Sequence, residues 1–412
     1  MKKLLLAGTA LTAFALLAAC SNGNSRSSNG KTTIEYLNYS SSPTYTKQLN
    51  QMVSEFEKEN PNIEVDVQSV PFDTYFTKLQ TLLAAGKAPD TFEMNYENFV
   101  SYANKGVLLD LSDKVKNDKS LDLSNVNKNA WNASTYQGKQ YGMTEDFSNV
   151  VTFYNKDLFD KAGVAYPTDS WTWSDEQAAA KKLTNDSAHV WGTYSPVTMN
   201  EFYKVVAQNK GEIYKNGKLN INSDANVEAL SHMAGLVTKE KVSPSPADMS
   251  GQTSEDLFLN GQLAMVHTGI WDFATFAKAP FKWDIAVEAG NKQQATHFFA
   301  DTVVVSKDSK NEDASYKWAK FMSTSDKAAK IRIEGSWNLP ITNSKAVLDE
   351  YLKQTPPANR EAVFKSLEYI VLPPVSDNWQ KLSVATDAEF QKVLIDQETP
   401  KHALDNLQNQ FK

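Results

Sequence analysis

The chain has 412 residues, of which 41% are hydrophobic and 11% aromatic, and its formal net charge is −7. A chain of this length exceeds what one hydrophobic core usually serves, so two lobes or domains are expected. The acidic balance and the lack of a basic cluster argue against nucleic acid as a partner and against adhesion of the protein surface to anionic lipid.

An uncharged segment from Leu4 to Ala19 follows a basic start at residues 1–3. This pattern predicts a secretory signal peptide over residues 1–19, because the apolar stretch is shorter than the ~20 residues that span a bilayer. It ends in Leu-Ala-Ala-Cys, which resembles the bacterial lipobox and implies cleavage before Cys20 and attachment of a lipid to its sulfur. Cys20 is the only cysteine, which suits a chain outside the cell without a disulfide. The alternative is an ordinary signal peptide followed by a chance cysteine.

The segment after this cysteine is rich in serine, asparagine and glycine and has no apolar residue to bury. We expect residues 20–31 to form a flexible tether between the lipid on Cys20 and a folded body that begins near Thr32. The membrane contact is then made by the lipid only.

Alternating strand and helix patterns follow the tether. Apolar spacing and the breakers Pro61 and Gly86 predict strands at 34–37, 63–67 and 91–95 and helices around 49–56 and 76–83. This order predicts an α/β fold with a largely parallel sheet that has helices on both faces.

Polar and aromatic side chains stand where the first and third of these strands end. Tyr39 follows the first strand, and Glu93, Asn95 and Tyr96 lie at the end of the third. Ligands bind beyond the carboxyl ends of parallel strands, so these residues are candidates for a binding site. A solvated loop is the alternative for each of them.

The pattern restarts further along the chain. We expect a strand at 150–154, a short helix at 155–163, a capping box at 174–177 that starts a helix to Leu183, and a mostly helical region at 191–242. A strand at 298–305, a helix around 314–322, a loop at 335–340 and a helix from Asp387 complete the prediction.

No motif marks a catalytic or metal centre. The five histidines do not pair with one another or with Cys20 at metal-ligand spacing, which favours surface or hydrogen-bonded structural roles for them. The chain has no Walker A, GxGxxG or GxSxG motif. We therefore expect neither a metal nor a cofactor.

Four stretches, taken in order, resemble the carbohydrate-binding lipoproteins of ATP-driven importers, the family that includes maltose-binding protein. They span most of the chain after the signal peptide, and no single one is specific alone. They are residues 83–90 with 106–111, residues 141–159 with 162–163, 167 and 172–173, residues 258–265 with 269 and 271, and residues 335–340.

This resemblance implies a two-lobed periplasmic-binding-protein fold with a ligand cleft between the lobes. The chain would cross between lobes near 143–147, 300–301 and 340–344, although Met143 stands where many relatives have proline. The implied division is residues 32–146 plus 301–340 in lobe 1, and 147–300 plus 341–412 in lobe 2.

The resemblance also implies a function. The protein would be the extracellular substrate-binding subunit of an ABC transporter, not an enzyme. It would capture a sugar or oligosaccharide and deliver it to the membrane permease. We expect a monomer that is lipid-anchored on the outer face of the cell membrane of a Gram-positive bacterium.

Sugar binding needs aromatic plates for the apolar faces and planar polar groups for the hydroxyls. The chain has nine tryptophans and sixteen tyrosines, most of which should be core. Trp271 with Asp272 is the first candidate pair, and capping of the lobe core by Trp271 is its alternative. The other candidates are Trp337 with Asn338 in the 335–340 loop, Trp379 after a Pro-rich turn, Asp146 and Asp301 at the crossings, and Tyr194 before a turn.

Two other classes stay open at this point. A secreted glycosidase needs two carboxyl groups ~5–10 Å apart, and Glu93 with Asp272 is one possible pair. A glycan adhesin would favour exposed aromatic strips and repeats, and the sequence shows neither.

Overall fold

The computed structural model describes residues 30–336, 338–374, 376 and 378–412. The predicted signal peptide (1–19), the lipidation site Cys20, most of the 20–31 tether and Trp337 therefore lie outside the described residues. Within the described part, no helix is long and apolar enough to cross a membrane.

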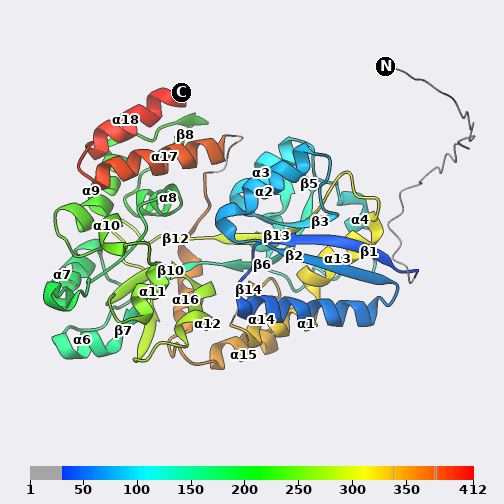
Figure 1. Ribbon diagram of the computed structural model, residues 1–412, viewed down its shortest axis with the longest axis horizontal. Coiled ribbons are helices and arrows are strands. Elements are labelled where there is room, and N and C mark those ends of the chain that lie inside the picture. Colours follow the sequence, from blue (N-terminus) through cyan, green and yellow to red (C-terminus); the bar gives the residue numbers. More distant parts are fainter. Residues whose placement is uncertain (1–29, 337, 375, 377) are drawn as a thin grey trace, which may run out of the picture.

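Figure 1 shows two bodies side by side, and the first is built on a six-stranded sheet with the strand order β14-β6-β13-β3-β1-β2. The pairs β1–β2 and β1–β3 are parallel and the other three pairs are antiparallel. The prediction of a largely parallel sheet is therefore wrong. The sheet is mixed because β13 pairs antiparallel with both β3 and β6. The strands are β1 (Thr32–Asn38), β2 (Ile63–Ser69), β3 (Thr91–Asn95), β6 (Gly142–Ser148), β13 (Phe299–Val305) and β14 (Leu339–Pro340).

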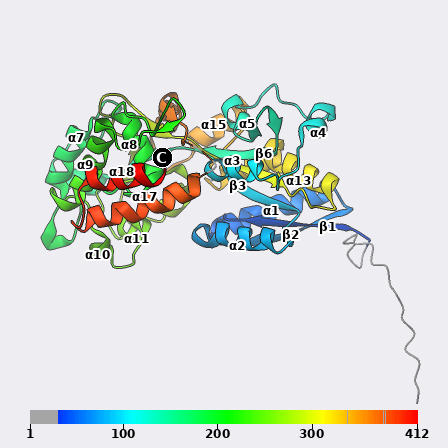
Figure 2. The same cartoon turned by 90° about the horizontal axis from the view of Figure 1, so that it is seen from above.

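Successive side chains of β1 point to opposite faces of this sheet, and each face carries its own core. Tyr36 packs with helices α1 and α13 in one cluster, and Leu37 packs with α2 and α3 in the other. Helices therefore cover both faces, as predicted (Figure 2). The helices of this body are α1 (Pro43–Glu59), α2 (Phe72–Ala84), α3 (Tyr96–Asn104), α4 (Ser112–Asn117), α5 (Lys128–Asn132), α13 (Glu312–Thr324) and α14 (Asp326–Glu334), with a hairpin of β4 (Thr135–Tyr136) and β5 (Lys139–Gln140).

The second body has a three-stranded antiparallel sheet with β7 in the centre, between β10 and β11. A short parallel pair, β12 with β15, lies beside it. The strands are β7 (Val150–Asn155), β10 (Met265–Gly269), β11 (Trp283–Ala286), β12 (Thr296–His297) and β15 (Ile370–Val371), and the hairpin β8 (Tyr214–Lys215) and β9 (Lys218–Leu219) joins two helices. The predicted strand at 150–154 is confirmed.

Helices surround these sheets (Figure 1). The capping box of α7 uses Thr172 and Asp175, so it lies two residues before the predicted position. The last long helices begin at Trp379 and not at Asp387. The helices are α6 (Lys156–Ala162), α7 (Trp173–Leu183), α8 (Met199–Gln208), α9 (Asp224–Thr238), α10 (Pro246–Met249), α11 (Ser254–Leu259), α12 (Phe273–Phe276), α15 (Lys345–Lys353), α16 (Glu361–Ser366), α17 (Trp379–Leu394) and α18 (Pro400–Gln410), with 3-10 turns at η1 (Asp186–Ala188), η2 (Ile270–Asp272) and η3 (Leu367–Tyr369).

The chain passes between the two bodies along strands that are hydrogen-bonded neighbours. Strand β6 leads into β7 with only Asn149 between them, and β12 leads into β13 with only Phe298 between them. Asp146 of β6 pairs with both Asp301 of β13 and Pro340 of β14. The junctions at Asn149 and Phe298 lie within a few residues of the crossings expected near 143–147 and 300–301. The crossings themselves stay a prediction. The exact lobe boundaries stay a prediction.

Candidate functional site

A cavity of about 640 Å³ is lined by residues from both bodies and from the crossing strands. Small-molecule sites in proteins commonly have volumes of ~300–1,000 Å³. The first body contributes residues 39–42 and 71–73. The second contributes, among others, Pro196, Thr198, Asn200, Glu201, His267, Thr268, Trp271 and His297. The cavity can therefore bury a ligand of oligosaccharide size and contact both bodies at once.

Tyr39 forms the wall of the cavity at the end of β1. Its hydroxyl donates to Asp301 Oδ1, and its backbone N–H donates to Glu93 Oε2 at 2.8 Å. Its ring makes edge contacts with Tyr75 and with Phe72, which is 47% exposed and also lines the cavity. The loop after the first strand is thus fixed by carboxylates from β3 and β13.

Four buried carboxyl groups meet where the strands cross. Burial raises the pKa of Glu145 to about 7, and burial together with neighbouring carboxylates raises the pKa values of Glu93 and Asp301 well above their usual range. Arg332 lies beside two of these groups: it hydrogen-bonds Glu145, and its Nε is 3.3 Å from Asp146 Oδ2. Burial therefore favours the protonated forms of these carboxyl groups, and a side-chain hydrogen bond joins Asp301 to Asp146.

Trp271 lies in the turn η2 and lines the cavity from the second body. Its ring lies against Gly269: a Cβ added there would be 2.0 Å from the ring. The ring also contacts Phe299, with 5.7 Å between centroids. The carbonyl of Trp271 accepts a hydrogen bond from the Tyr45 hydroxyl of α1, which joins the two bodies.

Asp272 is placed differently from its neighbour. It is buried and accepts a hydrogen bond of 2.7 Å from Thr268 Oγ1, and Thr268 rather than Asp272 lines the cavity. Burial raises the pKa of Asp272 to about 8. The carboxyl group therefore supports the wall behind Thr268 instead of lining the cavity itself.

The remaining sequence candidates divide into two groups. Asn95 and Asn338 line the cavity, and Asn338 Nδ2 donates to Asp146 Oδ1 at 2.9 Å. Other candidates lie behind the lining or away from it: Glu93 and Asp146 are buried beneath Tyr39 and Asn338, and Tyr96 and Tyr194 pack against the core of the second body.

The predicted aromatic plate at Trp379 needs correction. This residue is 3% exposed and packs in the hydrophobic cluster of α8, α9 and α17, with Tyr203 as an aromatic neighbour. Trp379 begins α17 and lies on the same helix face as the buried Leu382 and Thr386, three and seven positions later, so its ring points into that core. Trp337 lies outside the described residues.

Several lining residues were missed by the sequence reasoning. Phe72 opens α2 and its spacing suits a core position, while Glu201 lies in the first turn of α8, where an acidic residue is ordinary. His267 and His297 are buried and hydrogen-bonded, as the structural prediction for histidines stated, but both also line the cavity. Tyr45, Asn200, Asp73, Glu97 and Glu255 are further lining residues that were missed. The described residues contain no group of three or more His, Cys, Asp or Glu that could hold a metal ion.

The chain is similar to one family of known proteins in both sequence and structure. Residues 40–329 match the model of the family described as bacterial extracellular solute-binding protein. An ABC substrate-binding protein of Listeria monocytogenes, solved in complex with cycloalternan, is 58% identical, with a TM-score of 0.91, and the match covers 92% of this chain and 98% of that one.

Two curated relatives from Bacillus subtilis are more distant. The maltodextrin-binding protein is 25% identical over 405 residues, which cover 90% of this chain and 92% of the relative. The arabinooligosaccharide-binding protein is 28% identical over 275 residues, which cover 63% and 60%. These proteins are named for different carbohydrates, so membership in the family does not identify the ligand.

Proposed function

Because this chain belongs to the family of bacterial extracellular solute-binding proteins, we propose that the cavity binds cycloalternan or a carbohydrate of closely similar shape. The chain is the oligosaccharide-binding subunit of an ABC importer and is not an enzyme. The glycosidase considered from Glu93 and Asp272 is therefore excluded.

The observation that carries the ligand proposal is the pairing of aromatic and polar groups in one cavity. Trp271 and Phe72 offer rings to the apolar faces of sugar units, and Asn338 and Asn95 offer amide groups to hydroxyls. The 58% identity with the cycloalternan-bound protein supports the choice among carbohydrates.

Delivery to the transporter is the second part of the proposal. Cys20 carries the lipid, residues 20–31 are the tether, and the protein acts as a monomer on the outer face of the membrane of a Gram-positive bacterium. It hands its ligand to the permease subunits and contacts neither nucleic acid nor lipid through its protein surface. The lipobox-like sequence before Cys20 supports the anchor.

Ligand capture is proposed to close two lobes on the carbohydrate. The lobes are residues 32–146 with 301–340 and residues 147–300 with 341–412. The hydrogen bond between Tyr45 and the Trp271 carbonyl supports a closed arrangement, because it joins α1 to η2 across the cavity. A ligand that touches both lobes stabilises the closed form by its differential affinity.

Calorimetric titration with cycloalternan tests the ligand. We expect saturable binding at one site, and a rise in the free energy of unfolding of ~2.7 kcal/mol when the free carbohydrate is at 100 times its Kd. A maltodextrin and an arabinooligosaccharide serve as competitors. Tighter binding of either one would make the cycloalternan assignment wrong and leave the family function intact.

A further inference from the structure

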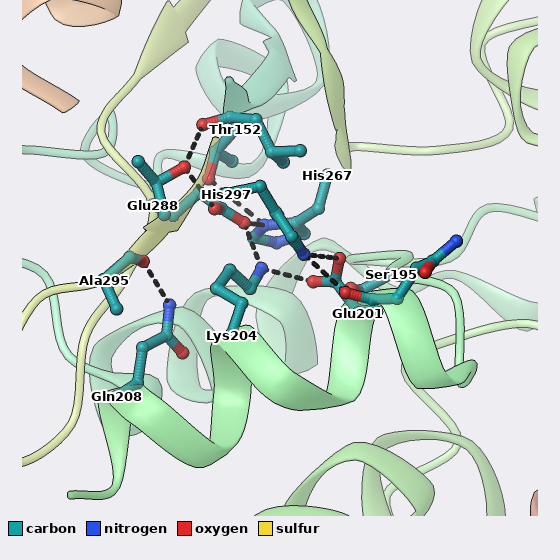
Figure 3. Close-up of polar contacts among 12 residues, drawn as sticks. Thr152, Ser195, Glu201, Lys204, Gln208, His267, Glu288, Ala295 and His297 are labelled. Carbon is teal, nitrogen blue, oxygen red and sulfur yellow. Dashed lines mark hydrogen bonds and ion pairs between the residues drawn. The ribbon is translucent and has the colours of Figure 1, made fainter. Parts of the chain in front are cut away.

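A buried set of charged side chains lies behind the wall that the second body gives to the cavity (Figure 3). It joins Glu201 and Lys204 of α8 to His267 of β10, Glu288 after β11 and Glu176 of α7. Lys204 Nζ bonds Glu201 Oε1 and lies 2.5 Å from Glu288 Oε1. His267 bridges Glu288 at 3.0 Å and Glu176 at 2.8 Å.

This ionic cluster holds more carboxylates than cations. Burial works against the charge of Lys204 and of His267, yet the carboxylates prevail and raise both pKa values, that of His267 to about 10. The neighbouring His297 and His232 have lowered pKa values because they are buried, and that of His232 is about 4. Two cations thus face the three carboxylates of Glu176, Glu201 and Glu288, and the cluster keeps an excess of negative charge.

Glu201 connects this cluster to the cavity, which it lines. Its Oε1 accepts from both Lys204 and Ser195 Oγ, the latter at 2.7 Å. Its Oε2 lies 3.6 Å from His297 Nε2, but that ring nitrogen is hydrogen-bonded to the Asn200 carbonyl at 2.7 Å. Oε2 therefore has acceptor capacity left for a hydroxyl group in the cavity.

The rest of the described lining is acidic as well, with Asp73 and Glu255 as further carboxylates beside Glu201. Five acidic residues line the cavity, and no lysine or arginine is among the described residues that do so. Glu97 and Asp301 hold protons more strongly than usual because they are buried. The cation that does line the cavity, His267, already has both ring nitrogens bonded to Glu288 and Glu176. A hydroxyl can donate to such a wall, whereas a bound anion would find no cation that is not already paired with carboxylates. The acidic lining residues are Asp73, Glu97, Glu201, Glu255 and Asp301.

We propose that the cavity selects neutral carbohydrates and excludes anionic ones of the same size, and that Glu201 is the residue that contributes most to this selection. The inference rests on the proposed function, since it assumes that the cavity takes a carbohydrate. It goes beyond that function because it defines the charge class of the ligand. Uronic acids, phosphorylated sugars and sulfated sugars belong to the excluded class.

Three probes of matched size test the charge selection by calorimetry at pH 7.5. They are cycloalternan, a derivative with one carboxylate, and a derivative with one amine at the same carbon. We expect cycloalternan and the amine derivative to bind within about tenfold of each other and the carboxylate derivative to bind about 100-fold more weakly, as like charges facing each other across an interface do.

The variant Glu201→Gln keeps the shape of the side chain and removes its charge. It should reduce the ratio of the Kd of the carboxylate derivative to the Kd of the amine derivative, here called the gap, by about tenfold. Glu64→Gln, an exposed position on β2 away from the cavity, is the matched control and should leave the gap unchanged. If Glu201→Gln does not fold, Glu255→Gln makes the same test from outside the ionic cluster.

Each outcome decides the proposal. Equal binding of the two charged derivatives, or a gap that Glu201→Gln leaves unchanged, would overturn it. Equal exclusion of both derivatives would show selection by size and overturn it as well. If cycloalternan itself does not bind, the ligand proposal fails alone, and the derivatives of the neutral carbohydrate that does bind decide the charge selection.

Discussion

Replacing Gly269 with alanine should weaken carbohydrate binding through Trp271 alone. The new Cβ would lie 2.0, 2.1 and 2.2 Å from three carbons of the indole ring, and carbon atoms at contact are ~3.5–4.0 Å apart. The ring must therefore move by about 1.5 Å or more. The backbone itself accepts alanine, because Gly269 has φ −82° and ψ 163°.

The size of the effect follows from the lost stacking. A stacked base on an aromatic side chain is worth ~1–3 kcal/mol, and a sugar face should be similar, so we expect affinity for cycloalternan to fall by about tenfold or more. Trp271→Ala should lower the affinity for cycloalternan by the same factor. In a double-mutant cycle, Gly269→Ala should have no further effect once Trp271 is alanine.

Calorimetry on the folded variants measures these affinities, with thermal unfolding as the check on folding. Gly235→Ala is the control, because a Cβ at this position in α9 meets nothing within 4 Å. Unchanged affinity in Gly269→Ala, or an equal loss with and without Trp271, would refute the argument that this glycine positions the ring.

Four other perturbations test separate parts of the molecule. Phe72→Ala should weaken carbohydrate binding by about three- to thirtyfold with little loss of stability, since the ring is 47% exposed at the cavity. Asp272→Asn should raise the thermal unfolding temperature more at pH 8 than at pH 5. Burial raises the pKa of Asp272 to about 8 in the folded protein, whereas its pKa in the unfolded chain is near 4, so the folded state loses stability as the pH rises from 4 toward 8. Asparagine cannot ionise and removes that loss. Cys20→Ser should release the protein into the medium or leave the precursor uncut, as cell fractionation would show. Saturating carbohydrate should lower the radius of gyration measured by small-angle scattering, because the two proposed lobes close.

The opposite results are equally clear. Full affinity in Phe72→Ala would place the carbohydrate away from α2. An equal rise in the unfolding temperature of Asp272→Asn at pH 5 and pH 8 would mean that Asp272 is ionised in the folded protein at both pH values. A Cys20→Ser protein that stays in the membrane fraction would refute the lipid anchor, and identical radii with and without ligand would favour a rigid, preformed cleft.

Local patterns predicted the elements well where each residue's environment depends on nearby sequence. The period of 2 in Ile63, Val65 and Val67 identified β2, and Gly86 marked the end of α2 with a positive φ of 64°. Whether neighbouring strands run parallel or antiparallel was not predictable in this way, because β13 lies between β3 and β6 in the sheet but far from both in the sequence.

The candidate site shows the same limit. Tyr39, Asn95, Asp301 and Asn338 reach the cavity because strand ends and crossings lead there, and Trp271 follows a strand in the same manner. The ionic cluster could not be found from sequence, since His267 and Glu176 are 91 positions apart and each looks ordinary alone. Trp379 failed as a candidate for a related reason: only tertiary packing decides which side of a helix start is buried.

The central place of β13 in the first sheet has a consequence for biosynthesis. Strands β3 and β6 cannot be joined until residues 299–305 have been made, because β13 lies between them. A nascent chain that ends before residue 299 therefore leaves β3 without one neighbour and β6 without both, and its first body is not finished. Contacts this distant in sequence form slowly. The first sheet is therefore completed only after residue 305 has been made, which delays the folding of the first body until late in synthesis.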